Sequence, residues 1–220
     1  MKKYTLSILS ILLTFFCNTQ TESFQYKQLH NSDLPVFQEF CNKAFKGYIT
    51  SDEDKDFLNG WTIEKYLLYI ANRTKYSTYI HACYQKDECI GFQVLRLNPT
   101  QNECPDADYI YDPTNSEQRE YKYGFIECTF VKPEYRKQGI ASKFITMSEK
   151  ECLKQGYLYI IRIGKSYNNA TENMYRKFNF KQLDPLKRTL WTKYLQTREQ
   201  IENNVIVVFE KHLSNQNLLP

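Results

Sequence analysis

The spacing of hydrophobic residues predicts a strand, a helix and a second strand in direct succession in the middle of the chain. The segment Phe125–Val131 has the β-branched and aromatic content of a strand, and Pro133 ends it because proline has no N–H to donate. Over Ile140–Cys152 the apolar residues recur every three or four positions, which indicates an amphipathic helix that Gly156 terminates. The run Tyr157–Ile163 is apolar almost throughout, as in a strand covered on both faces. This order predicts two parallel strands joined by a right-handed crossover.

The same patterns predict a second helix and further strands. Asn169 and Glu172 have the spacing of a capping box at the start of a helix over Asn168–Phe178. Asn179 tolerates the left-handed conformation in which helices commonly end, and a short strand follows it. The remaining strand patterns are Phe180–Leu183, a hairpin of Thr78–Gln85 and Glu88–Leu97 that turns at Lys86 and Asp87, and a last strand over Asn204–His212.

The turn between the first parallel strand and its helix is the most informative part of the chain. It places Arg136 and Lys137 immediately before Gly139, where the helix opens. The first turn of a helix has four N–H groups without intrahelical partners and a partial positive charge, so it binds an anion without rearrangement. Gly139 lets the anion approach closely because it has no Cβ. The segment therefore predicts a site for a diphosphate, although the same residues also fit a surface turn that binds nothing.

Two other phosphate-binding motifs do not fit this turn. A P-loop requires Lys and then Ser or Thr directly after its last glycine, but Ile140 and Ala141 follow Gly139. A dinucleotide fingerprint requires three glycines and an acidic residue about twenty positions later. Gly139 stands alone, and Ile160 and Ile161 occupy that distance. Both motifs are excluded.

Two blocks of residues resemble the GNAT superfamily of N-acetyltransferases. The turn over Arg136–Ala141 matches the family's acetyl-CoA loop, which has Gln or Arg, two residues, Gly, one residue, and Gly or Ala. The family's second block is similar to the segment from Asn168 to Phe180. The chain departs from that block at three positions, with Thr171 for a small residue, Met174 for Leu and Asn179 for Gly.

The resemblance implies a domain over residues 24–212 with an α/β (α+β) fold. Its sheet is mixed and mostly antiparallel, with splayed central parallel strands and helices on both faces. At the start of the domain it implies three elements, a first strand over Phe24–Leu29 and helices over Leu34–Phe45 and Thr62–Arg73.

The resemblance also implies that acetyl-CoA is the co-substrate. The pantetheine arm then pairs with the edge of the strand that ends at Val131, and the phosphates lie at the start of the helix. Asn168 contacts the pantetheine, or has only a structural role near the helix start. The residues implied to bind acetyl-CoA are Thr129, Phe130, Val131, Arg136, Lys137, Gln138, Gly139, Ile140, Ala141 and Asn168.

In the family an amine attacks the thioester directly, and a tyrosine on the second helix is commonly assigned as the acid that protonates the leaving thiolate. Tyr175 holds that position here. Glu127 is the candidate base, placed by strand alternation on the same face as Thr129 and Val131. Many relatives have an acidic residue where this chain has Phe125, so Glu127 could equally bind the substrate's ammonium or be a solvated strand residue.

Composition restricts the class of protein. The 220 residues are 42% hydrophobic and 15% aromatic, which suits one well-packed domain, followed by a polar tail over residues 213–220. The formal net charge of +4 is dispersed and predicts no nucleic-acid partner. Three scattered histidines and the absence of a Cys-x-x-Cys pair predict no metal site.

The first residues have the layout of a secretory signal peptide. Lys2 and Lys3 precede an apolar run over Tyr4–Phe16 that is too short to span a membrane, and a polar segment follows. Removal of residues 1–19 predicts an exported protein, secreted or periplasmic, with no stable membrane span. A cytoplasmic enzyme with a hydrophobic extension is the alternative. The six cysteines after Cys17 are compatible with disulfides but show no framework, and Cys128 and Cys152 are expected in the core.

The sequence therefore predicts an acetyl-CoA-dependent N-acetyltransferase acting on a primary amine of a small molecule or a protein, as a monomer or homodimer. The alternative is an exported, non-catalytic module with this fold that binds acyl-CoA or a protein partner. Two long segments, Asn98–Tyr121 and Asp184–Asn203, depart from a compact version of the fold, and we expect them to determine the substrate.

Overall fold

The computed structural model describes residues 23–43, 70, 77–98, 110–111, 120–165, 169–183 and 206–214. Most of the described strands form one sheet of seven, in the order β1-β2-β3-β6-β7-β9-β8, while β4 and β5 pair separately. The strands are β1 (Gln25–His30), β2 (Ser77–Gln85), β3 (Glu88–Asn98), β4 (Ile110–Tyr111), β5 (Glu120–Tyr121), β6 (Tyr123–Val131), β7 (Tyr159–Lys165), β8 (Lys181–Leu183) and β9 (Ile206–His212). The helices are α2 (Leu34–Lys43), α5 (Ile140–Lys154) and α6 (Asn169–Lys177), with a 3₁₀ turn η1 (Pro133–Tyr135).

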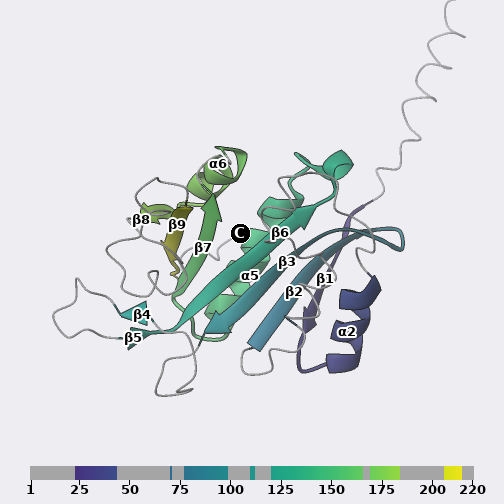
Figure 1. Cartoon of the computed structure of the whole chain (residues 1–220), viewed down its shortest axis with the longest axis horizontal. Coiled ribbons are helices and arrows are strands. Elements are labelled where there is room, and N and C mark those ends of the chain that lie inside the picture. The colour runs from purple at the N-terminus through teal and green to yellow at the C-terminus, as the bar shows by residue number, and fades with distance from the viewer. Residues whose placement is uncertain are drawn as a thin grey trace, which may run out of the picture.

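The sheet is mixed and mostly antiparallel, as predicted. Within the described strands, β6 and β7 form the parallel pair, and α5 makes the crossover between them. The other neighbours in the large sheet pair antiparallel. In Figure 1, β6 and β7 diverge toward their carboxyl ends, with α6 beside the end of β7.

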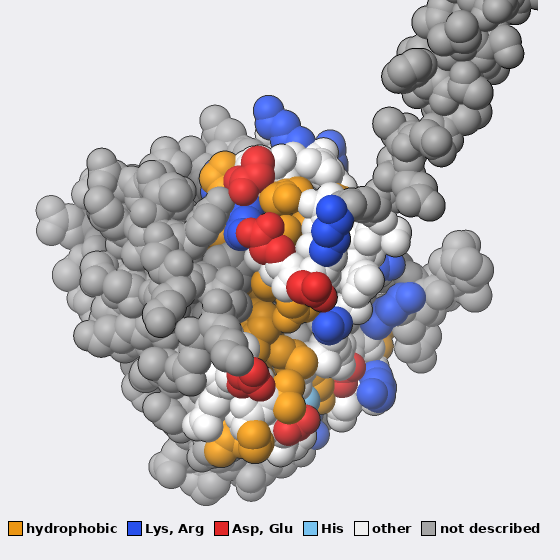
Figure 2. Space-filling model, turned by 90° about the vertical axis from the view of Figure 1, so that its right-hand side faces the viewer, with side chains coloured by type: hydrophobic (Ala, Val, Ile, Leu, Met, Phe, Trp, Pro, Cys, Tyr) orange, Lys and Arg blue, Asp and Glu red, His pale blue; other side chains and the backbone are white. Residues whose placement is uncertain are grey.

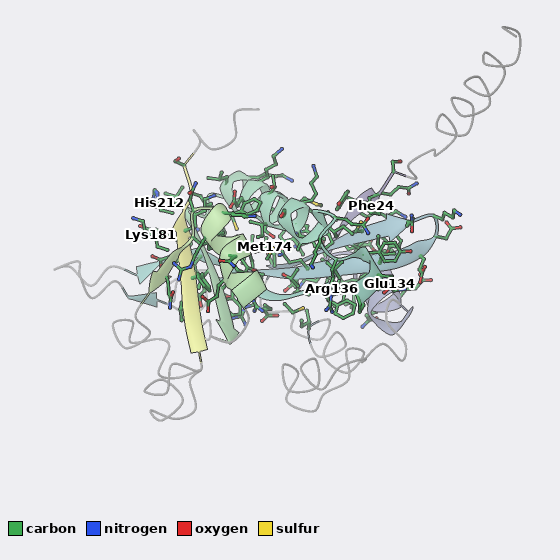
Figure 3. The ribbon with its side chains drawn as sticks, turned by 90° about the horizontal axis from the view of Figure 1, so that it is seen from above. Phe24, Glu134, Arg136, Met174, Lys181 and His212 are labelled. Atoms are coloured by element: carbon green, nitrogen blue, oxygen red, sulfur yellow. The ribbon has the colours of Figure 1, made fainter. Side chains whose placement is uncertain are left out.

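The helices cover both faces of the sheet (Figures 1 and 3). On one face, Phe37 and Phe40 of α2 pack with Ile70 against alternate residues of β2 and β3. On the other face, α5 and α6 share one hydrophobic cluster, in which Ile145 and Tyr175 pack with residues of the central strands. We refer below to the α2 face and the α5 face.

Both helices next to the parallel strands end in the left-handed conformation that the sequence predicts. Gly156 has a φ of 77°, its N–H donates to the carbonyl of Leu153, and the N–H of Tyr157 donates to that of Cys152. Asn179 has a φ of 61° and ends α6 with the equivalent pair of bonds. These are Schellman motifs, in which the residue after the helix must adopt a positive φ.

The hairpin is also confirmed, since β2 and β3 turn at Lys86 and Asp87, with Lys86 at a φ of 54°. Cys128 and Cys152 are buried, as expected, and are free thiols together with Cys83 and Cys89.

Several predictions concern residues outside the described ranges. They are the leader over residues 1–19, most of the helix over Thr62–Arg73, most of the loop over Asn98–Tyr121 and the whole of Asp184–Asn203. Ile70, in the second of these, is helical and buried against the α2 face. None of the described helices is long and apolar enough to cross a membrane. On the side of the molecule shown in Figure 2, basic and acidic side chains are interspersed, in keeping with the dispersed net charge.

Candidate functional site

The site is organised around the point where β6 and β7 separate. The two strands pair from Tyr123 opposite Tyr159 to Ile126 opposite Arg162. From Glu127 to Val131, β6 pairs with β3 alone among the described strands. Arg162 spans the point of separation, because its Nη1 donates to the carbonyl of Ile126 at 3.2 Å and to that of Glu127 at 2.7 Å. The predicted separation of the parallel strands is therefore present. The buried guanidinium of Arg162 links β7 to β6 where the separation begins.

The turn after β6 has the conformation that an anion site at the start of a helix requires. Lys137 and Gly139 both have positive φ, at 63° and 83°. Arg136 is exposed, and its Nε donates to the carbonyl of Val131 at 3.0 Å. That bond holds the guanidinium at the end of β6 through Nε alone, and the N–H groups of its two terminal nitrogens take no part in it. In Figure 3, Arg136 and Glu134 lie beyond the end of β6.

The backbone N–H groups at the start of α5 are open. The first intrahelical bond runs from the N–H of Lys143 to the carbonyl of Gly139, at 3.0 Å. Within the described part of the chain, the N–H groups from Gly139 to Ser142 have no protein acceptor, and no acidic side chain lies in the first turn. A Cβ added at Gly139 would meet no atom within 4 Å. Backbone N–H donors, the positive end of the helix dipole and open space for a ligand thus lie together at the start of α5. This is the arrangement that a diphosphate site requires.

Tyr175 lies inside the molecule, at the separated strands. Its side chain is fully buried, stacks on Phe209 and contacts the edge of Phe180. Burial raises the pKa of the phenol, while the guanidinium of Arg162 and the hydroxyl of Thr129 act in the opposite direction. The phenolic oxygen nevertheless makes no hydrogen bond of normal geometry to the described residues. Tyr175 is therefore a buried proton donor that has no acceptor among those residues. This is expected of a group that acts on a bound molecule.

The prediction that Glu127 shares a face with Thr129 and Val131 is wrong. The pairing of β3 with β6 goes from Val94 opposite Cys128 to Leu95 opposite Ile126, so Glu127 is the extra residue of a β-bulge. A bulge interrupts the alternation of side chains on which the prediction depended.

The consequence is that Glu127 and Thr129 belong to opposite faces. The carboxylate of Glu127 forms an ion pair with Arg96 at 3.2 Å, and Arg96 also lies over the ring of Phe125 on the α2 face. Thr129 instead accepts a hydrogen bond from Gln93 at 2.9 Å on the α5 face.

The other predicted residues divide into three groups. Thr129, Phe130 and Val131 are half-buried on the separated part of β6, with Phe130 stacked on Phe92. The loop residues Lys137 and Gln138 are exposed, whereas Ile140 is buried and Ala141 half-buried at the start of α5. Asn168 lies outside the described residues. Sequence reasoning missed Arg162, although a single basic residue within an apolar strand was a signal.

Comparisons with known proteins agree with this geometry. A model of the acetyltransferase (GNAT) family matches residues 46–180, which is more than half of the chain. The structure is similar to that of the PaiA N-acetyltransferase of Thermoplasma acidophilum, solved in complex with coenzyme A. The TM-score is 0.51 and the identity 17%, over 86% of this chain and 99% of that one.

A second solved structure, NAA60 of Arabidopsis thaliana with a bisubstrate analogue, has a TM-score of 0.49 and 14% identity over 87% of this chain and 100% of that one. No curated protein sequence matches the chain. The likeness to PaiA supports the fold, and the family match supports the resemblance of the two sequence blocks. The chain belongs to the acetyltransferase (GNAT) family.

Proposed function

We propose that the protein is an N-acetyltransferase that moves the acetyl group of acetyl-CoA to a primary amine of a small molecule or a protein. The observation that carries this proposal is the open N-terminus of α5, with Arg136 and Lys137 beside it, at the end of a strand that has separated from its parallel neighbour. A phosphate-bearing group held at the helix lies next to a free strand edge.

From the start of α5 along β6, successive groups of the chain fit the diphosphate, the pantetheine arm and the thioester of acetyl-CoA. The N–H groups of residues 139–142 and the cations of Arg136 and Lys137 suit the diphosphate. The edge of β6 from Thr129 to Val131, which lacks a described strand on that side, suits the amides of the pantetheine arm. The thioester then lies toward the narrow end of the splay, where Arg162 and Tyr175 are found.

Transfer requires a neutral amine as nucleophile and a proton for the sulfur that leaves. An ammonium has no lone pair, so a base or a chain of waters must first remove a proton from the amine. In this proposal Tyr175 protonates the leaving thiolate. Arg162 and Thr129 support that role, because both act to lower the pKa of the phenol against the effect of burial. Glu127 remains the candidate base, now on the α2 face and ion-paired to Arg96.

Binding and turnover need separate measurements. Calorimetry of the chain without its leader should show heat on titration with acetyl-CoA, and a free-thiol assay over a panel of amines should show release of coenzyme A. The ion pair at Glu127 and the non-acidic Phe125 favour a second candidate, a module with this fold that binds acyl-CoA without turnover. Heat without thiol release for every amine would support that candidate, whereas no heat would refute both.

We also propose that the chain is exported, on the strength of the basic and apolar layout of residues 1–16. Because acetyl-CoA is a cytosolic metabolite, an exported acetyltransferase would act after delivery into another cell's cytosol. Fractionation of a culture with and without host cells should place the shortened chain in the medium or the host. Recovery of only the full-length chain in the producing cell's cytosol would refute export.

A further inference from the structure

Two arginine side chains bond to the edge of β6 that faces the separation from β7. Arg162 Nη1 donates to the carbonyls of Ile126 and Glu127, at 3.2 and 2.7 Å. Arg136 Nε donates to the carbonyl of Val131 at 3.0 Å. Both donors are side chains, although the carbonyls of a strand ordinarily accept from the backbone of a neighbouring strand. The two arginines therefore mark the two ends of the separated part of β6.

The pairing with β3 shows which backbone groups lie between these two ends. Lys132, directly after β6, donates its N–H to the carbonyl of Ile90 at 2.9 Å, so its backbone groups point toward β3. Successive residues of a strand direct their backbone groups to alternate sides, so those of Val131 and Thr129 point away from β3. Among the described strands, none pairs with these two residues on that side. The carbonyl of Thr129 and the N–H groups of Thr129 and Val131 are called the open edge below.

The β-bulge gives a physical reason for a guanidinium at the inner end of the open edge. At the bulge the carbonyls of two successive residues, Ile126 and Glu127, point toward β7, whereas a regular strand directs only one of them there. A backbone N–H of β7 could donate to one of them, but Nη1 of Arg162 carries two hydrogens and serves both. Without the bulge, Thr129 and Val131 would turn their backbone groups toward β3. Arg162 therefore stabilises the form of β6 in which the open edge exists.

An arginine is an unusual residue at this place in the sheet. Its side chain is buried, its neighbours along β7 are Ile160, Ile161 and Ile163, and its partner in register on β9 is Phe209. A buried charge destabilises the fold unless hydrogen bonds compensate for the water that it loses, so an isoleucine would be less costly here. The bonds to the two carbonyls at the bulge give this compensation. The guanidinium thus contributes to the shape of β6 rather than to the packing of β7.

We infer that Arg162 is a positioning residue for acetyl-CoA, because it fixes the inner end of the strand edge on which the pantetheine arm lies. Its guanidinium occupies the carbonyls of Ile126 and Glu127, so the amides of a ligand pair with the open edge only. Arg136 closes the outer end in the same way, next to the diphosphate site. The inference rests on the proposed function, to which it adds a defined position of the arm along β6.

Calorimetry with two ligands tests this inference. Coenzyme A has the pantetheine arm, and 3′-phospho-ADP is the same molecule without it. We expect Arg162→Met to weaken binding of coenzyme A about tenfold, the effect of one or two hydrogen bonds, and to leave the affinity for 3′-phospho-ADP unchanged. Arg162→Lys should recover part of the loss, since an ammonium also carries more than one hydrogen.

Lys211→Met is the matched control for the loss of a buried cation. Lys211 lies on β9, and its Nζ bonds to Glu149 of α5, at 2.8 Å, rather than to β6. This variant should leave both affinities unchanged. An equal loss for both ligands in Arg162→Met, or no loss for coenzyme A, would overturn the inference.

A second measurement needs no ligand. Hydrogen exchange of single backbone amides, followed by NMR, reports on local opening of the strands. We expect Arg162→Met to speed exchange at Cys128, which follows the bulge, about tenfold relative to Ile80 on β2, and Lys211→Met to leave this ratio unchanged. An unchanged ratio in Arg162→Met overturns the inference even if the affinity for coenzyme A falls. A chain that binds neither ligand refutes the proposed function, while the exchange ratio still decides whether Arg162 stabilises the bulge.

Discussion

His81 should make the stability of the fold depend on pH between the pKa values that this residue has in the folded and the unfolded chain. Its side chain is fully buried, and burial lowers its pKa to about 4, while nearby Glu151 on α5 acts in the opposite direction. The other groups that face the ring, on β1, β3 and α5, are uncharged: Gln28, Gln93 and Ser148. The unfolded chain takes up a proton at His81 near the ordinary pKa of about 6.5, whereas the folded chain does not. Folding therefore releases a proton in this range, and stability must fall as the pH falls.

The size of the effect follows from the two pKa values. The full difference between about 6.5 and about 4 corresponds to roughly 3 kcal/mol, and the loss between pH 7.5 and pH 5.5 is about 1.4 kcal/mol. Urea unfolding at these two pH values should show that loss in the wild type and a smaller one in His81→Asn, although the variant is less stable at both. His212→Asn is the matched control, since it makes the same replacement at an exposed histidine on β9, and the effect of His81→Asn is compared with it. Equal losses for the wild type and His81→Asn would refute the reasoning.

Three further predictions concern the site and its support. Arg136→Glu should weaken binding of acetyl-CoA at least tenfold in calorimetry, because it places an anion against the diphosphate. The control Lys150→Glu, on the exposed side of α5, should leave the affinity unchanged. Equal affinities of the two variants would refute the assignment of the loop as the diphosphate site. Tyr175→Phe should lower kcat on the order of 10²-fold with near-normal affinity for acetyl-CoA. An unchanged kcat would mean that Tyr175 has only a packing role. Gly124→Ala should lower the free energy of unfolding by about 1–3 kcal/mol, because its Cβ would lie 2.3 Å from Cys152 Sγ, and Cys152→Ala should recover part of that loss. Additive losses in the double variant would show that the two side chains do not conflict.

Local features of the fold were predictable because their causes are local. The ends of α5 and α6 depend on single residues, Gly156 and Asn179, that tolerate a positive φ. The parallel pair follows from the order strand, helix, strand, and the open amides follow from a glycine before a helix.

The features that the sequence did not predict depend on contacts between distant segments. The bulge at Glu127 exists only in the register with β3, which no pattern within β6 encodes. Hydrogen bonds on the α5 face likewise join side chains of β1, β2, β3, β6 and α5, and each of these residues taken alone is typical of an ordinary strand or helix. Strand alternation placed Glu127 on the wrong face for the same reason.

The bulge gives the site two sides. Before it, Gly124 and Ile126 face α5; after it, Thr129 and Val131 do, and the bulged Glu127 is released to the α2 face. The same residue is where β6 leaves β7, so its carbonyl accepts from Arg162 while its carboxylate pairs with Arg96. Tyr175, the proposed acid, and the proposed anion site thus belong to the α5 side, and the candidate base Glu127 to the opposite side. An amine that used Glu127 would approach from the α2 face, and a thioester bound along β6 would separate it from Tyr175. Direct transfer in a ternary complex requires the amine to add to one face of the planar thioester carbonyl, and the thiolate then leaves from the tetrahedral intermediate. The arrangement satisfies this if the α2 face presents the amine to the carbonyl while the sulfur lies within reach of Tyr175.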